Sequence, residues 1–274
     1  MLCQMASSAK QTARSAKNST AMHVLARGGF VASGVLHIII GTIAITLATG
    51  GGSSTEADQS GAFSELAQAP GGKVLLWAAA IGLAALGVWL LLSSFLDRSW
   101  GGKQSRAAHI VQSLAKGIVY LVLAFTAFTF AIGGSTSSAQ STSAISQKLM
   151  GTPGGIIVVV LIGFALLGVA AYMVFKGVSL RFERDIRVPP RPAGGPLRVL
   201  GVVGYVARGV ALGAVGVLFL AGAITHDPSK TSGLDGALKS FASLPFGAVV
   251  LIAIGVGWIA YGIYAFFRAR LARL

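Results

Sequence analysis

Hydrophobic residues form six long runs along the chain, separated by polar segments. The runs cover residues 28–49, 74–96, 117–133, 155–175, 209–225 and 246–267. A helix of about 20 apolar residues crosses the ~30 Å hydrocarbon core of a bilayer, and irregular backbone cannot face lipid. The pattern therefore predicts an all-α, polytopic membrane protein with six transmembrane helices. Lys116 and Arg208 interrupt apolar stretches that begin near residues 110 and 199, so we expect each to lie inside a longer helix.

The odd-numbered runs begin with one shared motif, which indicates an internal repeat. The motif is Ala-Arg-Gly at residues 26–28 and 207–209, and Ala-Lys-Gly at residues 115–117. The even-numbered runs share a proline before them (Pro70, Pro153, Pro245) and a glycine within them (Gly82, Gly163, Gly255). These features predict three tandem helical hairpins in a pseudo-threefold arrangement. The expected division is a polar arm (1–22), repeat 1 (23–97), repeat 2 (98–178), a basic linker (179–196), and repeat 3 with a basic tail (197–274).

The segment before each proline predicts a short amphipathic helix at the membrane surface. Apolar residues recur about four and seven or eight places before the proline: Leu66 and Phe63, Leu149 and Ile145, Phe241 and Leu238. This spacing puts each pair on one face of a helix of about two turns. We favour caps that seal one end of the bundle over lids that close on a substrate.

Together these motifs resemble a known family of bacterial membrane proteins. The resemblance rests on the Ala-Arg/Lys-Gly helix starts, on Gly-Leu-Asp-Gly-Ala-Leu from Gly233 and on Leu-Pro-Phe-Gly from Leu244. The family is "domain of unknown function 1206", which is mainly actinobacterial, and the similarity covers roughly residues 26–268. It implies six spans in three repeats of a two-helix hairpin, and it implies no established activity.

Composition and charge agree with this architecture. Hydrophobic residues make up 54% of the chain and charged residues only 11%, whereas soluble domains carry about 25% charged residues. Eighteen of the 22 Lys and Arg, with three acids, lie on the side that holds both termini; the other side holds four basic residues and five acids. Basic loops remain in the cytoplasm, so we expect a multi-pass protein of the bacterial inner membrane with cytoplasmic N- and C-termini. The net charge of +14 then needs no nucleic-acid partner.

Few residues offer chemistry. Cys3 is the single cysteine, which excludes an internal disulfide, and no Asp or Glu lies inside the six runs. Ion-coupled transporters usually hold intramembrane carboxylates, and the chain carries neither a zinc-protease nor a serine-hydrolase motif. We therefore expect no enzyme activity, no cofactor and no metal.

His37 is the one ionisable residue near the middle of a run. It shares a helical stripe of small residues with Gly29, Ser33 and Gly41, and such stripes let helices approach closely. The favoured interpretation is a neutral imidazole that hydrogen-bonds across a helix interface. A proton relay or a ligand contact is the alternative.

Arg27, Lys116 and Arg208 occupy equivalent positions in the three repeats. If the repeats pack with pseudo-threefold symmetry, the three cations converge, and an anion such as a lipid phosphate would offset their repulsion. The alternative is that each side chain reaches a separate headgroup.

The leading functional hypothesis is a non-enzymatic membrane module. It would bind lipid or an anionic amphiphile at its cytoplasmic face, scaffold a membrane partner, or do both; its partners would be anionic lipids, with another membrane protein or a second copy of the chain as further candidates. The alternative is a facilitator or channel for a small solute. The polar residues of such a path would be Ser33, His37, Thr42, Thr46, Thr126 and Thr129.

Overall fold

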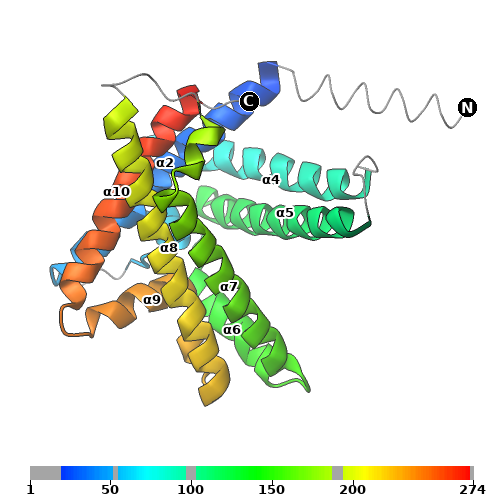
Figure 1. Ribbon diagram of the computed structural model, residues 1–274, viewed down its shortest axis with the longest axis vertical. Coiled ribbons are helices and arrows are strands. Elements are labelled where there is room, and N and C mark those ends of the chain that lie inside the picture. Colours follow the sequence, from blue (N-terminus) through cyan, green and yellow to red (C-terminus); the bar gives the residue numbers. More distant parts are fainter. Residues whose placement is uncertain (1–19, 52–54, 97–102, 187–193, 272–274) are drawn as a thin grey trace, which may run out of the picture.

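The computed structural model describes residues 20–51, 55–96, 103–186 and 194–271. Within these ranges all regular elements are helical (Figure 1). The long helices are α2 (Thr20–Ala48), α4 (Gly72–Leu96), α5 (Lys103–Ala131), α7 (Gly155–Val178), α8 (Gly194–Thr225) and α10 (Gly247–Leu271). The short ones are α3 (Gln59–Gln68), α6 (Ser138–Met150), η1 (Arg181–Asp185), η2 (Pro228–Thr231) and α9 (Gly233–Ala242). Cys3 and most of the arm expected at residues 1–22 lie outside the described ranges.

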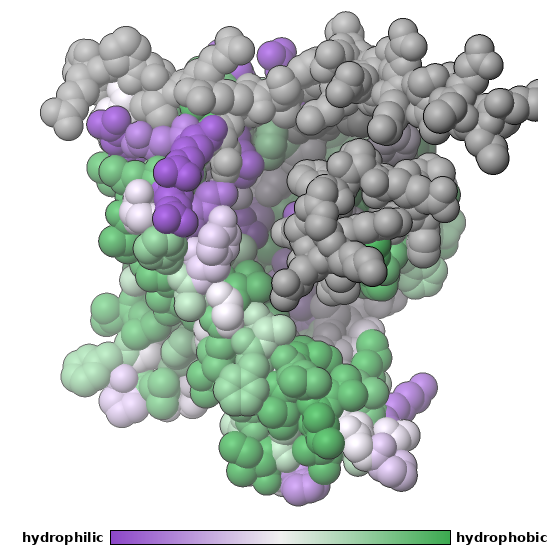
Figure 2. Space-filling view, turned by 45° about the vertical axis from the view of Figure 1, so that its right-hand side comes forward, coloured by the Kyte–Doolittle hydropathy of each residue, from purple (hydrophilic) through white to green (hydrophobic). Residues whose placement is uncertain are grey.

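The prediction of an all-α protein with six membrane spans is confirmed. Each long helix contains 19 to 32 residues that are apolar enough to cross a membrane. Lys116 and Arg208 lie inside α5 and α8, as the interrupted runs predicted. Hydrophobic side chains dominate the middle and the lower part of the face in Figure 2, and hydrophilic side chains gather near its upper end, with a few more at the lower edge. The first turn of α2 and the last turn of α10 lie at the same end of the molecule (Figure 1).

The odd-numbered spans α2, α5 and α8 end in the same way. A residue with positive φ follows each of them: Gly50, Gly133 and His226. The next residue donates its backbone N–H to a carbonyl five positions earlier, as in Gly51 to Thr46 (3.1 Å), Gly134 to Thr129 (2.9 Å) and Asp227 to Gly222 (2.9 Å). This is the Schellman arrangement, which satisfies the free carbonyls at a helix end.

The even-numbered spans begin with one turn that occurs three times. The residue after the proline has positive φ, at Gly71, Gly154 and Phe246. The following glycine donates its N–H to the residue before the proline, at 2.8–3.0 Å, and the φ of 77° and ψ of −5° at Gly154 are those of a type II turn. A Cβ on Gly72, Gly155 or Gly247 would lie 1.6–1.8 Å from a carbonyl oxygen of the preceding short helix. Glycine is therefore required at these three positions.

Each odd-numbered span packs mainly against an even-numbered span of another repeat. α2 lies along α10, α5 along α4, and α8 along α7. The two spans of one repeat therefore do not form a closely packed hairpin in repeats 1 and 2; they are joined by a short helix and pair with neighbouring repeats. In repeat 3, α8 also packs against α10. Repeats 1 and 3 pack together through α2 and α10, so each repeat pairs with both of the others.

Glycines set the close approach within these pairs. A Cβ on Gly41 would lie 2.6 Å from the carbonyl oxygen of Gly255, and a Cβ on Gly255 would lie 2.7 Å from that of Gly41. Gly87 faces Gly117 in the α4/α5 pair, and Gly163 faces Gly216 in the α7/α8 pair, with corresponding distances of 3.1–3.2 Å. In a lipid solvent, close backbone packing of this kind drives helix association.

The three short helices α3, α6 and α9 confirm the predicted amphipathic segments. Phe63 of α3 packs against α4 and α5, Leu149 of α6 against α7 and α8, and Leu238 of α9 against α2 and α10. The assignment of Ile145 to the buried face was wrong, because its side chain is 60% exposed and Ser146 is 3% exposed. Phe63, Ser146 and Leu238 each lie seven positions before the proline of their repeat. The buried position is therefore the same in all three short helices.

Candidate functional site

A polar junction lies where α2, α8 and α10 meet. His37 of α2 contacts Tyr261 of α10 with a ring-centroid distance of 4.8 Å, and Trp258 at 5.6 Å. The Arg208 guanidinium of α8 lies 4.3 Å from the centroid of the same Tyr261 ring. Arg208 is also near enough to His37 for an electrostatic interaction. Two candidates that the sequence analysis treated separately therefore share one site.

His37 hydrogen-bonds within its own helix. Its Nδ1 lies 2.6 Å from the carbonyl oxygen of Ser33, one turn earlier, so Nδ1 carries the proton that is donated. The prediction that His37 hydrogen-bonds across a helix interface was wrong for the described residues, because His37 contacts α10 only through aromatic rings. The reason is geometric: one helical turn places the Ser33 carbonyl directly within reach, and α10 presents aromatic rings at this level.

Arg208 is half-buried and has an aromatic partner instead of a carboxylate. Among the described residues no acid forms an ion pair with it and no group accepts a hydrogen bond from it. A guanidinium over a tyrosine ring gains about 0.5–2 kcal/mol, but its N–H groups remain available to an acceptor. The Nε1–H of Trp258, a residue that is 5% exposed, also lacks a partner among these residues. The junction therefore offers donors without matching acceptors, which suits an anion.

The other two members of the basic trio lie elsewhere. Arg27 is exposed on α2 and precedes His37 by ten residues, which is about 15 Å along a helix. Lys116 is exposed on α5, which packs against α4 and α3. The structure thus joins Arg208 to His37 and leaves Arg27 and Lys116 apart from that site. Whether the three cations act in one binding event stays a prediction for experiment.

Two further basic side chains at this end of the bundle lie over aromatic rings. Lys176 lies 5.3 Å from the ring centroid of Tyr205, and Arg268 lies 4.5 Å from that of Phe30.

Tyr261 was not predicted from the sequence as a site residue. Its signal was the recurrence of aromatic residues every three positions on one face of α10, at 258, 261 and 264.

A second polar cluster joins repeats 1 and 2 at the opposite end. Glu56 accepts hydrogen bonds from the Ser137 hydroxyl and from the Ser138 N–H at 3.1 Å. Asp58 caps α3 by accepting the N–H groups of Ser60 (2.8 Å) and Gly61 (3.2 Å). Burial raises the pKa of Asp58 to about 6. Burial also acts to raise the pKa of Glu56, but hydrogen bonds to Ser137, Ser60 and α6 outweigh it, so this pKa lies below its ordinary value.

Repeat 3 contributes to the same cluster through α9. Asp235 accepts the backbone N–H of Ala57 at 2.9 Å and pairs with Lys239 at 2.7 Å. Charged and polar groups of all three repeats thus link the short helices to one another. This arrangement favours the cap interpretation of the short helices, since their polar groups are used in contacts between repeats.

Four threonine hydroxyls that were expected to line a solute path donate hydrogen bonds within their own helices. Thr42 and Thr46 donate to Ile39 and Thr42 carbonyls at 2.7 and 3.0 Å. Thr126 and Thr129 likewise donate to carbonyls one turn earlier, at 3.0 and 2.9 Å. Back-bonded hydroxyls of this kind are compatible with a lipid-facing helix. In the described part of the chain, no three His, Cys, Asp or Glu side chains gather into a metal-binding group.

The sequence comparisons give this architecture a family. The family model described as "Domain of Unknown Function (DUF1206)" matches the chain three times, at residues 28–97, 111–179 and 203–272. The chain is also 31% identical over 253 residues to "Uncharacterized protein YxxB" of Bacillus subtilis (strain 168), and the alignment covers 88% of each sequence. No solved structure matches. The three matches coincide with the three span–cap–span repeats, so the chain belongs to the family described as Domain of Unknown Function (DUF1206).

Proposed function

We propose that this membrane protein is a non-enzymatic module that binds an anionic phospholipid or a related amphiphile at its basic end. The observation that carries the proposal is the state of Arg208, a half-buried cation that lies over Tyr261 without a carboxylate partner among the described residues. Holding a cation near hydrocarbon is costly unless an anion or acceptor accompanies it. A lipid phosphate is the anion that a membrane supplies in abundance.

The proposal includes an orientation and a membrane. Basic residues concentrate at the end where α2 begins and α10 ends, whereas the end that holds α3, α6 and α9 carries five of the eight acids. On the positive-inside rule we infer that the basic end lies in the cytoplasm, and that the protein resides in the cytoplasmic membrane of a bacterium. The same end would be available to a protein partner or a second copy. The back-bonded threonines support a lipid-binding module more than a channel, because their hydrogens are already used within their own helices.

Native mass spectrometry with phosphatidylglycerol tests this function. We expect the wild-type protein in neutral detergent to retain one phosphatidylglycerol in preference to phosphatidylcholine. Arg208→Gln should weaken retention about tenfold or more, because a hydrogen bond to a charged group contributes about 1.5–3 kcal/mol. Arg27→Gln and Lys116→Gln should have smaller effects.

Lys148→Gln is the matched control, since it removes a basic charge from α6 at the opposite end. Equal, additive losses for the Arg27, Lys116 and Arg208 variants would mean that the cations contact separate headgroups and would contradict a site at Arg208. A shared site for all three would instead appear as loss of the same lipid in every single variant.

A further inference from the structure

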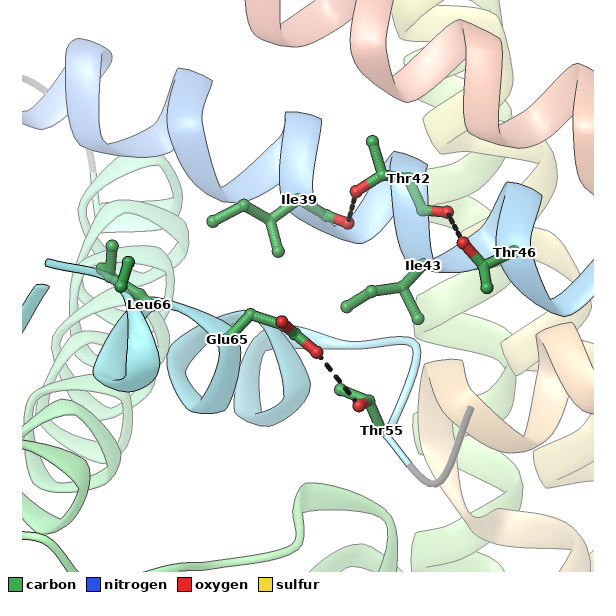
Figure 3. A pocket seen from close by; sticks show the side chains of 8 residues that line it. Ile39, Thr42, Ile43, Thr46, Thr55, Glu65 and Leu66 are labelled. Carbon is green, nitrogen blue, oxygen red and sulfur yellow. Dashed lines mark hydrogen bonds between the residues drawn. The ribbon is translucent and has the colours of Figure 1, made fainter. Parts of the chain in front are cut away.

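A pocket of about 390 Å³ opens between α2 and α3, in the half of the bundle away from the basic end. Its residues are Ile39, Thr42, Ile43, Thr46, Thr55, Glu65, Leu66 and Ala69. Figure 3 shows Glu65 reaching from α3 under α2 towards Thr55, with Thr46 on the same side and with Ile39 and Leu66 on the other. The volume lies within the range of about 300–1,000 Å³ that is common for small-ligand sites.

The polar groups of the pocket are hydrogen-bond acceptors. Thr42 and Thr46 donate their hydroxyl hydrogens to backbone carbonyls of α2, and Thr55 donates to Oε1 of Glu65 at 3.1 Å. A hydroxyl has one hydrogen and two lone pairs, so Thr42 and Thr46 can each still accept but have no hydrogen left to donate. None of the eight lining residues is basic. The pocket therefore matches a ligand that donates hydrogen bonds and carries positive charge.

The pocket is also amphipathic. Glu65, Thr46 and Thr55 form its polar part, while Ile39, Ile43 and Leu66 supply an apolar wall. Along α2, Ile39 precedes Thr46 by seven residues, or about 10 Å. The apolar wall thus extends from the polar part towards the middle of the membrane. A ligand with a polar head and a short hydrocarbon tail fits this gradient.

The chemistry of the pocket is particular to repeat 1. Glu65 lies five residues before Pro70, and the same position before the other prolines holds Lys148 in repeat 2 and Ser240 in repeat 3. Thr42 lies eight residues before Gly50, the positive-φ residue that ends α2, and the same position before Gly133 and His226 holds Phe125 and Leu218. A carboxylate beside threonines is therefore not a general consequence of the repeated fold.

We propose that the pocket between α2 and α3 binds a primary organic ammonium with a short apolar tail. The ammonium lies against Glu65 and the threonine oxygens, and the tail follows Ile39 and Ile43. Its three N–H donors complement the acceptors, and its charge complements the carboxylate. This site is distinct from the Arg208 junction in both charge and position.

Octylammonium is the probe, and octanoate of the same chain length is the matched anion. We expect titration calorimetry in neutral maltoside detergent to show saturable binding of octylammonium and no binding of octanoate. Glu65→Gln should weaken octylammonium binding at least tenfold, although the new amide oxygen can still accept from Thr55, and the exposed position of Glu65 leaves the fold intact. Thr46→Leu, which fills the pocket with an apolar side chain, should weaken binding independently of charge.

Lys148→Gln, at the equivalent position of repeat 2, should leave octylammonium binding unchanged. Equal binding by the wild-type protein and the Glu65→Gln and Thr46→Leu variants would mean partition into the micelle and would overturn the proposal. Saturable binding of octanoate at the same site would overturn it as well. Phosphatidylglycerol retention should be unaffected by Glu65→Gln, so failure here and failure of the lipid-binding function give different results.

Discussion

A single hydroxyl group makes the contact between repeats 1 and 2 sensitive to protons. The Oγ of Ser60 lies 2.6 Å from Oε2 of Glu56 and 2.6 Å from Oδ1 of Asp58. One hydroxyl hydrogen can be donated to only one of these acceptors at a time, so two ionised carboxylates would compete for it. Protonation of Asp58 would remove this competition; Asp58 is 2% exposed, and burial and the charge of Glu56 raise its pKa to about 6. Asp235 and Lys239 of α9 are the other charged groups in this cluster.

The raised pKa of Asp58 predicts that the protein becomes less stable as the pH rises. A carboxyl group whose pKa is higher in the folded than in the unfolded protein stabilises the fold below its unfolded value, near 3.8, and this contribution is lost as pH rises through about 6. Two pKa units correspond to roughly 3 kcal/mol as an upper estimate. We expect the thermal midpoint in detergent to increase when the pH is lowered from 7.5 to 5.

Asp58→Asn supplies the matched variant for this prediction. Its amide oxygen can take the place of Oδ1, which accepts the two capping N–H groups and the Ser60 hydroxyl, and the amide carries no charge that burial would penalise. The variant should be more stable than wild type at pH 7.5 and should lose the dependence between pH 5 and 7.5. Glu56 acts in the opposite direction, because its lowered pKa stabilises at high pH and this contribution fades as pH falls below about 4.5. An unchanged pH profile in Asp58→Asn would exclude Asp58 as the titrating group.

At the scale of the helices, equivalent positions in the repeats have different surroundings. Gly82, Gly163 and Gly255 align in the sequence repeat. A Cβ on Gly255 would lie 2.7 Å from the Gly41 carbonyl oxygen, and one on Gly163 would lie 2.8 Å from a side-chain atom of Leu220. A Cβ on Gly82 meets nothing within 4 Å. The pairing of helices across repeats, and not the repeat itself, decides which glycines are needed.

Alanine substitution of these glycines measures that pairing. Gly255→Ala should destabilise the protein by roughly 1–3 kcal/mol, because the clash is with backbone of α2 and the helices must separate. Gly82→Ala should be neutral or stabilise by about 0.5–1 kcal/mol, since alanine favours helix over glycine. Thermal unfolding in one detergent compares the two variants directly. Equal losses at Gly82 and Gly255 would contradict the α2/α10 pairing.

At the scale of the whole molecule, the cap helices α6 and α9 lie towards one end, and the starts of α2 and α8 and the ends of α7 and α10 lie at the other (Figure 1). Gln68 and Ser229 are exposed at the first end, and Ser179 is exposed at the second. The proposed orientation puts Gln68 and Ser229 outside the cell and Ser179 in the cytoplasm.

Single cysteines test this orientation in a Cys3→Ser background. Cysteines introduced at Gln68 and Ser229 should react with a membrane-impermeant maleimide on intact cells, whereas a cysteine introduced at Ser179 should react after permeabilisation. The Ser179 variant is the internal control for cell integrity. The reverse pattern would invert the topology and move the Arg208 junction to the outer side.

Most of the helices and turns could be predicted from patterns of neighbouring residues in the sequence. Six apolar runs are sufficient for six spans because lipid permits few other backbone structures. Proline and glycine positions marked the turns, since φ is restricted at proline and free at glycine. The error at Ile145 arose because counting seven or eight residues back from a proline does not decide which of two neighbours faces inward.

The amino-acid sequence by itself thus determined the all-α class, the spans, the three repeats and the short cap helices, because each depends on residues close together in the chain. Tertiary structure alone decided that α2 pairs with α10, that Arg208 joins His37 and not the other two cations, and that Glu65 faces the threonines of α2. Each of these depends on contacts between helices, and hydrophobic runs in lipid carry little information about which apolar face meets which. Backbone approach at glycines such as Gly41 and Gly255 makes that choice, and it is visible only when the helices are assembled.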